Sequence, residues 1–308
     1  MLLLAVLFLL ASFLRIVSGA DWCYQSQVTC NKTCAGPDTW GLVSEHCSGR
    51  SQSPVNIVTR RALQDERLTP LHLTGYQETF HSLIMNTGHG VKLDLSSKMR
   101  IQGGNLPATY KTIQLHLHWG KDGGLGSEHL IDGEQFPMEM HIVHIKEKYD
   151  SLSEAVTDRT GVAVLGFFFQ ESEFANKKFD PIIKALKYIQ QPKNSTTLRE
   201  VSLDMFTPPQ TNMTKYFRYE GSLTTPDCAE AVVWTVFEDT IPLSRKQLTA
   251  FSQLQFSDGK PMVRTYRPVQ PMNERPVYYS RGHVASVSTM LLILAALVPS
   301  ALSLHTTA

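Results

Sequence analysis

Two histidines stand at a spacing that lets them hold one metal ion together. His116 and His118 lie two residues apart in the apolar segment 113–119. Successive side chains of a β-strand point to opposite faces, so both imidazoles would share one face with Gln114. Both rings could then bind a metal ion without bending the backbone.

A second segment, 138–144, offers a third imidazole on a matching face. The same alternation places Glu139, His141 and Val143 together. If the two strands are neighbours, His141 becomes a third ligand. Three histidines leave one position of a tetrahedral zinc ion open for water, which is the catalytic form of a zinc site. Because these ligands are neutral, the metal keeps its full charge and acidifies that water.

Each strand also carries a residue that can orient a ligand. Gln114 and Glu139 stand two residues before His116 and His141, on the same faces. Both can accept a hydrogen bond from a ring N–H, as partners of metal-bound histidines do. A lone H-x-H pair in a strand is more often polar surface. The third histidine and the two acceptors favour zinc, although the spacing does not specify the reaction.

The surrounding sequence predicts a mostly β domain that positions these strands. The segment 91–95 alternates in polarity, and 161–169 and 231–237 have the continuous apolar character of buried strands. Helical patterns are few and short. One is capped by Asp180 and another by Ser244. We find no internal repeat, heptad pattern or linker.

The composition is that of an ordinary globular protein. Of 308 residues, 42% are hydrophobic and 19% are charged, with a net charge of +1. No basic excess is present, which argues against a nucleic-acid binder and against electrostatic binding to acidic membranes. Two apolar runs at the ends stand apart, and between them residues 21–280 form one predicted domain.

The first apolar run, residues 2–14, precedes small residues that end at Ala20. A short apolar stretch before small residues is typical of a secretory signal peptide, here residues 1–20. The run is shorter than the about 20 residues that a membrane span needs. We therefore expect an exported protein.

The second apolar run, residues 290–303, is also short for a span and has no basic flank. Small residues and a spacer precede it, as in a signal for a glycosylphosphatidylinositol (GPI) anchor. Ser280 is the predicted attachment residue, with Gly282 and Ser286 as rivals. In this interpretation residues 281–308 are removed, and we favour it over a true span.

Cysteines and glycosylation sequons fit export. Five cysteines are present, at Cys23, Cys30, Cys34, Cys47 and Cys228. In a secreted chain they suggest disulfides, with one thiol left over, and no C-x-x-C pair suggests a cysteine zinc site. Sequons occur at Asn31, Asn194 and Asn212.

Six short motifs occur in order between residues 38 and 275. They are 52–57 (QSPVNI), 114–120 (QLHLHWG), 126–129 (GSEH), 139–144 (EMHIVH), 221–226 (GSLTTP) and 267–271 (RPVQP). Together they resemble the α-carbonic anhydrases, and six motifs in one order are far more specific than any single one. Within the family the sequence resembles the cell-surface type IV branch, with type XV as a rival.

The resemblance implies a single domain built on a large twisted, mainly antiparallel β-sheet, with short peripheral helices and a central zinc cleft. It implies Zn²⁺ bound by His116, His118 and His141, in agreement with the alternation argument. It also implies reversible hydration of carbon dioxide to bicarbonate and a proton at the extracellular face, by attack of zinc-bound hydroxide.

The resemblance also assigns roles to residues that the spacing leaves unmarked. Thr224 matches the threonine that accepts a hydrogen bond from the hydroxide, and Glu128 matches the carboxylate that orients this threonine. His89 matches the proton shuttle, since an imidazole titrates near neutral pH. Thr225 matches a contact to bicarbonate. An apolar wall for carbon dioxide matches Val143, Val164, Leu223, Val232 and Trp234.

The type IV branch carries two disulfides that match cysteines of this chain. By resemblance, Cys23 pairs with Cys34 and Cys47 with Cys228, which leaves Cys30 unpaired. Pairing of Cys23 with Cys30 remains an alternative. The second bridge would tether the loop near Thr224, residues 221–228, to the N-terminal segment.

Several residues depart from the family pattern near the cleft. Leu42 stands where many members have tyrosine, and Thr87, Lys92 and Thr265 stand where better-known members have asparagine. These departures bear on the water network and on turnover rather than on the reaction. A lysine beside His89 is expected to lower the pKa of that imidazole by like-charge repulsion.

Two other classes of function compete with an active enzyme. Some members of the family have lost zinc ligands and act as recognition modules, but here the three ligands, Glu128 and Thr224 are all present. A zinc hydrolase of another kind needs a general base such as that of H-E-x-x-H, which does not occur. A bicarbonate transporter is a reasonable partner for a surface enzyme, although no residue shows it.

Overall fold

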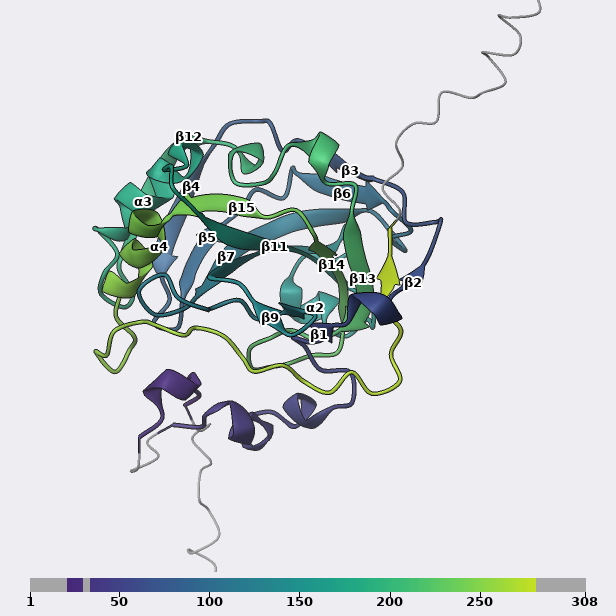
Figure 1. Cartoon of the computed structure of the whole chain (residues 1–308), viewed down its shortest axis with the longest axis horizontal. Helices are drawn as coiled ribbons and strands as arrows, with labels where there is room; N and C mark the ends of the chain where they lie inside the picture. The colour runs from purple at the N-terminus through teal and green to yellow at the C-terminus, as the bar shows by residue number, and fades with distance from the viewer. Residues whose placement is uncertain (1–20, 30–33, 281–308) are drawn as a thin grey trace, which may run out of the picture.

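The computed structural model describes residues 21–29 and 34–280, which are built around one large β-sheet of 13 strands (Figure 1). The main path of the sheet runs through β12 (Ser195–Val201), β4 (Phe80–Asn86), β5 (Val91–Asp94), β7 (Tyr110–Trp119), β10 (Met138–Lys146), β11 (Val162–Ser172), β14 (Val232–Phe237), β13 (Tyr216–Gly221), β16 (Tyr278–Tyr279) and β2 (Leu63–Gln64). Three further strands join it at the side: β3 (Leu71–Thr74), β6 (Arg100–Gly103) and β15 (Ile241–Ser244).

Most neighbouring strands of the large sheet are antiparallel. The exceptions are β11 beside β14 and β15, and β16 beside β2. A small second sheet contains β1 (Asn56–Ile57), β8 (Leu130–Ile131) and β9 (Glu134–Gln135). The predicted mostly β, mainly antiparallel domain is confirmed.

Helices are short and lie at the periphery. The α-helices are α2 (Leu152–Ala155), α3 (Asp180–Leu186) and α4 (Arg245–Ala250). The short 3₁₀ helices are η1 (Gln25–Gln27), η2 (Pro37–Leu42), η3 (Glu45–Ser48), η4 (Thr59–Arg61), η5 (Lys177–Phe179), η6 (Leu203–Met205), η7 (Gln210–Asn212) and η8 (Phe251–Gln253). Figure 1 shows α3 and α4 beside one another at one end of the sheet.

The two predicted helix caps fare differently. Ser244 caps α4 as expected, because its side chain accepts a hydrogen bond from the Gln247 N–H. Asp180 does not cap α3; it is the first helical residue, and Phe179 precedes it without a side-chain cap. The turn η5 runs directly into α3, so the helix needs no separate side-chain cap there.

Alternation along the strands divides the core between the two faces of the sheet. On β10, Met140 and Ile142 belong to the larger hydrophobic cluster, whereas Val143 and Ile145 belong to the smaller one. The register shift between Val143 and His144 is a local irregularity in the pairing with β7. The central strands are thus buried on both faces, which explains their continuous apolar runs.

Two disulfides fix the N-terminal segment, which lies along one edge of the domain in Figure 1. Cys23 is bonded to Cys34, and Cys47 is bonded to Cys228, as the resemblance implies. The second bridge joins residues 181 positions apart in the sequence. Within the described residues, no helix is long and apolar enough to cross a membrane.

Several predictions lie outside the described residues. These are the signal peptide at residues 1–20, Cys30, the sequon at Asn31, and the anchor signal at residues 281–308 with Gly282 and Ser286.

Candidate metal centre

Strands β7 and β10 are neighbours, and their register brings the three predicted ligands together. His141 lies opposite His116 in the antiparallel pairing, and His118 follows on the same face of β7. One nitrogen from each ring lies within 4.8 Å of the others. His118 and His141 are fully buried, and His116 is partly exposed to a cavity. The predicted three-histidine cluster is therefore present.

Hydrogen bonds leave the right nitrogens free to bind a metal. His118 Nδ1 lies 2.7 Å from the Thr265 carbonyl oxygen, so it carries the proton and donates. His141 Nε2 lies 2.6 Å from Glu139 Oε1 and donates to it. The opposite nitrogens, His118 Nε2 and His141 Nδ1, then present lone pairs. Buried His118 Nε2 has no hydrogen-bond partner among the described residues, which fits a ligand atom.

The protonation of the rings also suits a metal. Burial lowers the pKa of His118 to about 3. Burial likewise lowers the pKa values of His116 and His141, and their mutual proximity lowers that of His116 further. Neutral imidazoles are the form that binds a metal. The donor set, three neutral imidazoles of which two are buried, is one that Zn²⁺ accepts in catalytic sites.

One of the two predicted orienting bonds is absent. Gln114 does not bond His116, whose Nδ1 is buried without a partner among the described residues. Gln114 shares the face and lines the same cavity as His116, so alternation placed it correctly. The side chain is long and rotatable, and parity along a strand does not determine where its amide points.

Glu139 is confirmed as the acceptor for His141 and does more than the alternation indicates. Its Oε2 accepts the backbone N–H groups of Glu128 and His129, and its Oε1 also contacts His129 Nδ1 at 2.7 Å. Burial alone would raise the pKa of Glu139, but pairing with His129 and His141 lowers it well below its usual value. Glu139 is therefore an anion that orients two imidazoles.

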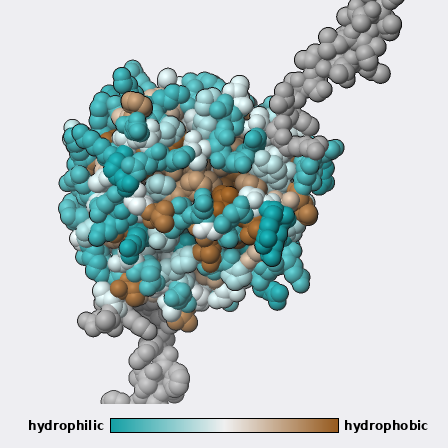
Figure 2. Space-filling view, in the orientation of Figure 1, coloured by the Kyte–Doolittle hydropathy of each residue, from teal (hydrophilic) through white to brown (hydrophobic). Residues whose placement is uncertain are grey.

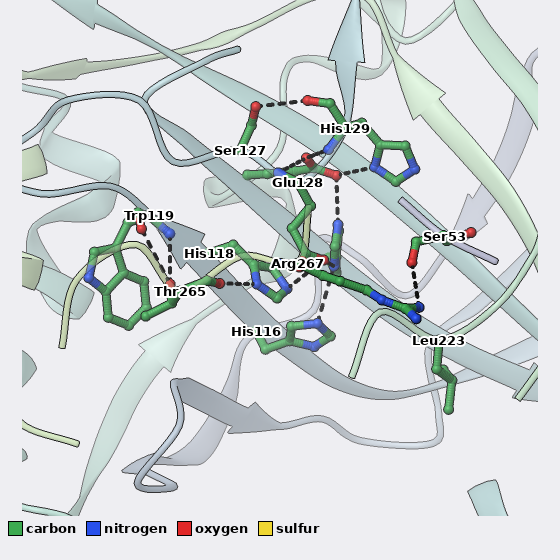
Figure 3. A network of polar contacts seen from close by, with 12 residues as sticks. Ser53, His116, His118, Trp119, Ser127, Glu128, His129, Leu223, Thr265 and Arg267 are labelled. Atoms are coloured by element: carbon green, nitrogen blue, oxygen red, sulfur yellow. Dashed lines mark hydrogen bonds and ion pairs between the residues drawn. The ribbon is translucent and has the colours of Figure 1, made fainter. Parts of the chain in front are cut away.

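Residues that the alternation argument missed extend this network. His129 Nε2 lies 2.6 Å from the Tyr219 hydroxyl, which lies 2.8 Å from Ser53 Oγ. Thr265 orients His118 through its carbonyl, and its hydroxyl accepts the Trp119 N–H (Figure 3). Backbone carbonyls give no sequence signal. His129, in contrast, stands within the GSEH motif, and Ser53 stands within the QSPVNI motif.

Glu128 lies beside the histidine cluster. Its Oε2 is 3.3 Å from His118 Nε2, and its Oε1 accepts the backbone N–H of Arg267 at 2.8 Å (Figure 3). Burial raises the pKa of Glu128 well above its usual range, while the Arg267 N–H and the Thr224 hydroxyl oppose that rise. Buried Thr224 is thus close to this carboxyl, as the resemblance requires.

The residues predicted for the apolar wall pack in one hydrophobic cluster next to His141. Val143 lies opposite Val164 on β11, and Val164 lies opposite Trp234 on β14. The Trp234 ring centroid is 4.8 Å from that of His141. Val232 and Leu223 belong to the same cluster, Leu223 being partly exposed. Hydrophobic residues also gather in the middle of the face shown in Figure 2, which is otherwise largely hydrophilic.

His89 lines a cavity of about 180 Å³ together with His116, His118 and Thr225. Its ring stacks on Trp22 with 4.0 Å between centroids. Burial lowers the pKa of His89, whereas Asp21 and Asp258 raise it. Lys92 forms an ion pair with Asp94 at 2.8 Å, and its expected effect on the pKa of His89 stays a prediction.

Comparison with known proteins matches the chain to the family model of eukaryotic-type carbonic anhydrases over residues 35–281. Carbonic anhydrase 4 of Oryctolagus cuniculus is 42% identical over 274 residues, covering 87% of this chain and 88% of the relative. The chain belongs to the eukaryotic-type carbonic anhydrase family.

Further relatives agree with the branch that the motifs suggest. Carbonic anhydrase 4 of Mus musculus is 41% identical and covers 92% of both chains. Carbonic anhydrase 15 of Mus musculus is 35% identical, covering 92% of this chain and 91% of the relative.

The departures from the family pattern leave the centre intact. Thr265 contributes its carbonyl to His118, which any residue at that position can do. Leu42 is 82% exposed. The Thr87 hydroxyl donates to the Gly90 carbonyl and accepts the Gly90 N–H, so its hydrogen bonds stay within its own turn. The departures therefore leave the three histidines of the cluster unchanged.

Proposed function

We propose that the protein catalyses reversible hydration of carbon dioxide to bicarbonate and a proton, with Zn²⁺ bound by His116, His118 and His141. Membership of the carbonic anhydrase family supports the reaction. The observation that carries the proposal is the convergence of three neutral imidazole nitrogens within 4.8 Å. A second candidate, a recognition module, has no observation in its favour.

The metal, when bound, supplies the charge that lowers the pKa of a coordinated water, for which carbonic anhydrase is the standard example. The protein's own groups do the rest. Glu139 and the Thr265 carbonyl orient two of the imidazoles. Thr224 and Glu128 position the oxygen nucleophile, and positioning of this kind lowers the barrier by reducing the entropy lost on reaction.

The substrate and the proton take different parts of the cleft. Carbon dioxide is small and apolar, so it lies against Val143, Val164 and Trp234 while the polar ligands face it. The proton leaves through His89, which lines the same cavity as His116. Thr225, at that cavity, contacts bicarbonate.

We further propose that the protein acts at the outer cell surface, where residues 1–20 and 281–308 have been removed. Ser280 is the proposed anchor residue. Its buried hydroxyl accepts the Tyr216 N–H and donates to the Thr214 carbonyl, so an anchor there would follow directly after β16. Release from intact cells by a phospholipase specific for GPI anchors supports the anchor. Retention on the membrane after that treatment supports a span.

Two of the proposed glycosylation sites are within the described residues. Asn194 and Asn212 are both exposed, as carbohydrate attachment requires. Removal of N-linked glycans should lower the mass of the secreted protein, and Asn194→Gln and Asn212→Gln should each remove part of that change.

The reaction is tested with residues 21–280 secreted from animal cells. Carbon dioxide hydration is measured by stopped flow and zinc by elemental analysis, before and after a zinc chelator. We expect fast turnover that the chelator abolishes and zinc restores. His116→Ala should lose both zinc and activity, whereas His72→Ala, at an exposed histidine of β3, should lose neither. A folded, zinc-loaded but inactive protein would refute the proposal and favour a recognition module.

A further inference from the structure

A surface groove lies beside one of the two glycosylation sequons within the described residues. It has a volume of about 630 Å³ and is lined by residues of the segments 172–178, 205–212 and 239–242. Asn212, the last residue of η7, is one of these lining residues. None of the groups proposed for carbon dioxide hydration lines this groove. A glycan on Asn212 would therefore begin at the groove itself.

The groove contains an aromatic ring that the fold leaves uncovered. Phe174 lines it and is 78% exposed. Phe174 belongs to neither of the two hydrophobic clusters of the described residues. An aromatic side chain buries about 150–250 Å² when it is covered, so Phe174 keeps a large apolar surface available for contact. Met205, Pro209 and Pro242 add apolar surface along the same groove.

Hydrogen bonds hold in place the segment that carries Phe174. The side-chain amide of Asn176 donates to the Pro242 carbonyl at 3.1 Å. Gln247, on α4, accepts the Asn176 N–H at 2.9 Å and donates to the Asn176 carbonyl at 2.8 Å. The wall of the groove is thus largely fixed before anything binds, which reduces the entropy lost on binding.

A glycan on Asn212 differs from any other occupant because a covalent bond would deliver it to the groove. Asn212 is exposed, and its Oδ1 accepts the Thr211 hydroxyl at 3.1 Å, which leaves the amide nitrogen for the sugar. A short tether gives an effective concentration on the order of millimolar, so even weak contacts are populated. Asn194, the other described sequon, is exposed and does not line the groove.

We propose that the carbohydrate on Asn212 docks into this groove and that its first sugar rings pack against Phe174. The inference rests on the proposed glycosylation of Asn212 and is independent of the proposed reaction. A sugar ring presents C–H groups on its faces and hydroxyls at its edge. The faces suit the aromatic ring, and the hydroxyls suit the polar side chains of Lys177, Lys178 and Asp239 that line the same groove.

The first experiment uses the protein secreted from animal cells, after mass spectrometry of its glycopeptides has established whether Asn212 carries a glycan. Thermal unfolding is compared for the parent, Phe174→Ala, Asn212→Gln and the double variant. Phe174→Ala should lower the midpoint of the parent by about 2–4 °C, because it removes the packing surface of the glycan. In the Asn212→Gln background the same change should lower it by less than about 1 °C, as at an ordinary exposed position.

Asn194→Gln is the matched control, because it removes a glycan that does not border the groove. In that background Phe174→Ala should lower the midpoint as much as in the parent. Equal losses in the parent and Asn212→Gln, with Asn212 glycosylated, overturn the docking alone. A protein without carbohydrate on Asn212 overturns the glycosylation and the docking together, so the two failures are distinguishable.

Hydrogen exchange locates the contact without any change at Phe174. Backbone amides of residues 174–178 should exchange about fivefold more slowly in the glycosylated parent than in Asn212→Gln, because the glycan opposes local opening of this segment. Asn194→Gln should exchange there like the parent. Equal exchange in the parent and Asn212→Gln contradicts the docking. Protection that rises with protein concentration in both proteins assigns the groove to a second copy of the chain and also contradicts it.

Discussion

Glu139 accepts four hydrogen bonds inside the protein, from His141, His129 and two backbone N–H groups. All of its oxygen capacity serves to hold one ligand and the turn that carries Glu128. A buried carboxylate is tolerated only when it is satisfied in this way. At the residue scale, the metal centre therefore depends on a group that need not touch the metal.

Glu139→Gln tests that dependence. The neutral amide cannot accept hydrogen bonds from both imidazoles as strongly as a carboxylate does, so the His141 ring is held less firmly in position. We expect zinc affinity to fall by about 10–100-fold. Competition with a chromogenic chelator measures it. Glu134→Gln, the same change at an exposed residue of β9, should leave affinity unaltered. Equal affinities for parent and Glu139→Gln would show that the carboxylate is not needed.

A second prediction concerns the pH dependence that Trp22 imposes on His89. The His89 ring stacks on Trp22, and burial lowers its pKa. Only the deprotonated ring accepts a proton. The midpoint of the fall in kcat toward acid pH should thus lie below about pH 6.5, the usual pKa of an imidazole. Trp22→Ala exposes the ring, and the limb should move to higher pH. Trp22→Phe retains an aromatic cover and should shift it less. Superimposable pH–rate profiles would rule out this role.

At the scale of elements, the two-residue alternation along β10 separates residues of the larger core cluster from residues on the side of the proposed cleft. On β10, Val143 faces the apolar wall beside His141, whereas its neighbour Ile142 packs into the cluster on the opposite face. Both are buried aliphatic residues, and only their direction differs. Adjacent substitutions should therefore have effects of different kinds.

Val143→Phe should fill the space for carbon dioxide. We expect kcat/KM to fall by at least about tenfold with zinc content unchanged, since a few carbon atoms in an apolar pocket change specificity by that order. Ile142→Val should instead cost about 0.5–1.5 kcal/mol of unfolding free energy and leave kcat/KM unchanged. Stopped-flow kinetics and urea titration measure the two quantities. A reversed pattern would place the wall on the other face.

At the scale of the whole molecule, the Cys47–Cys228 bridge joins the N-terminal segment to the loop that carries Thr224. The Cys228 N–H also bonds the Thr225 carbonyl, and Gln52 Nε2 donates to the Cys228 carbonyl at 3.2 Å. The loop thus depends on contacts made across most of the chain length. The Cys23–Cys34 bridge closes a much shorter loop, of sequence separation 11.

Replacing both cysteines of a bridge by serine should therefore lower the free energy of unfolding more at Cys47–Cys228 than at Cys23–Cys34. A longer closed loop restricts the unfolded chain more, and loss of a native disulfide typically costs about 2–5 kcal/mol. Urea unfolding of the two double variants measures the difference. The Cys47/Cys228 variant should also lose kcat/KM, because Thr224 and Thr225 are less fixed. A larger loss at Cys23–Cys34 would contradict this account.

The alternating pattern along two segments was sufficient to predict which faces of β7 and β10 carry His116, His118 and His141, because the two-residue period is a local property of extended backbone. The pairing of Glu139 with His141 followed from the same period. The roles of Thr224, Glu128 and His89 came from whole-motif resemblance, since each alone has the character of a loop residue.

Only the tertiary structure decided which partners complete the centre. The Thr265 carbonyl reaches His118 across 147 positions, and the Arg267 N–H reaches Glu128 across 139. Every residue has such backbone groups, so no side-chain pattern marks them. Gln114 shows the converse, since its place on the strand was predictable but the bond predicted to His116 is absent. Local periodicity determines which face a side chain occupies, whereas the path of the whole chain determines what meets it there.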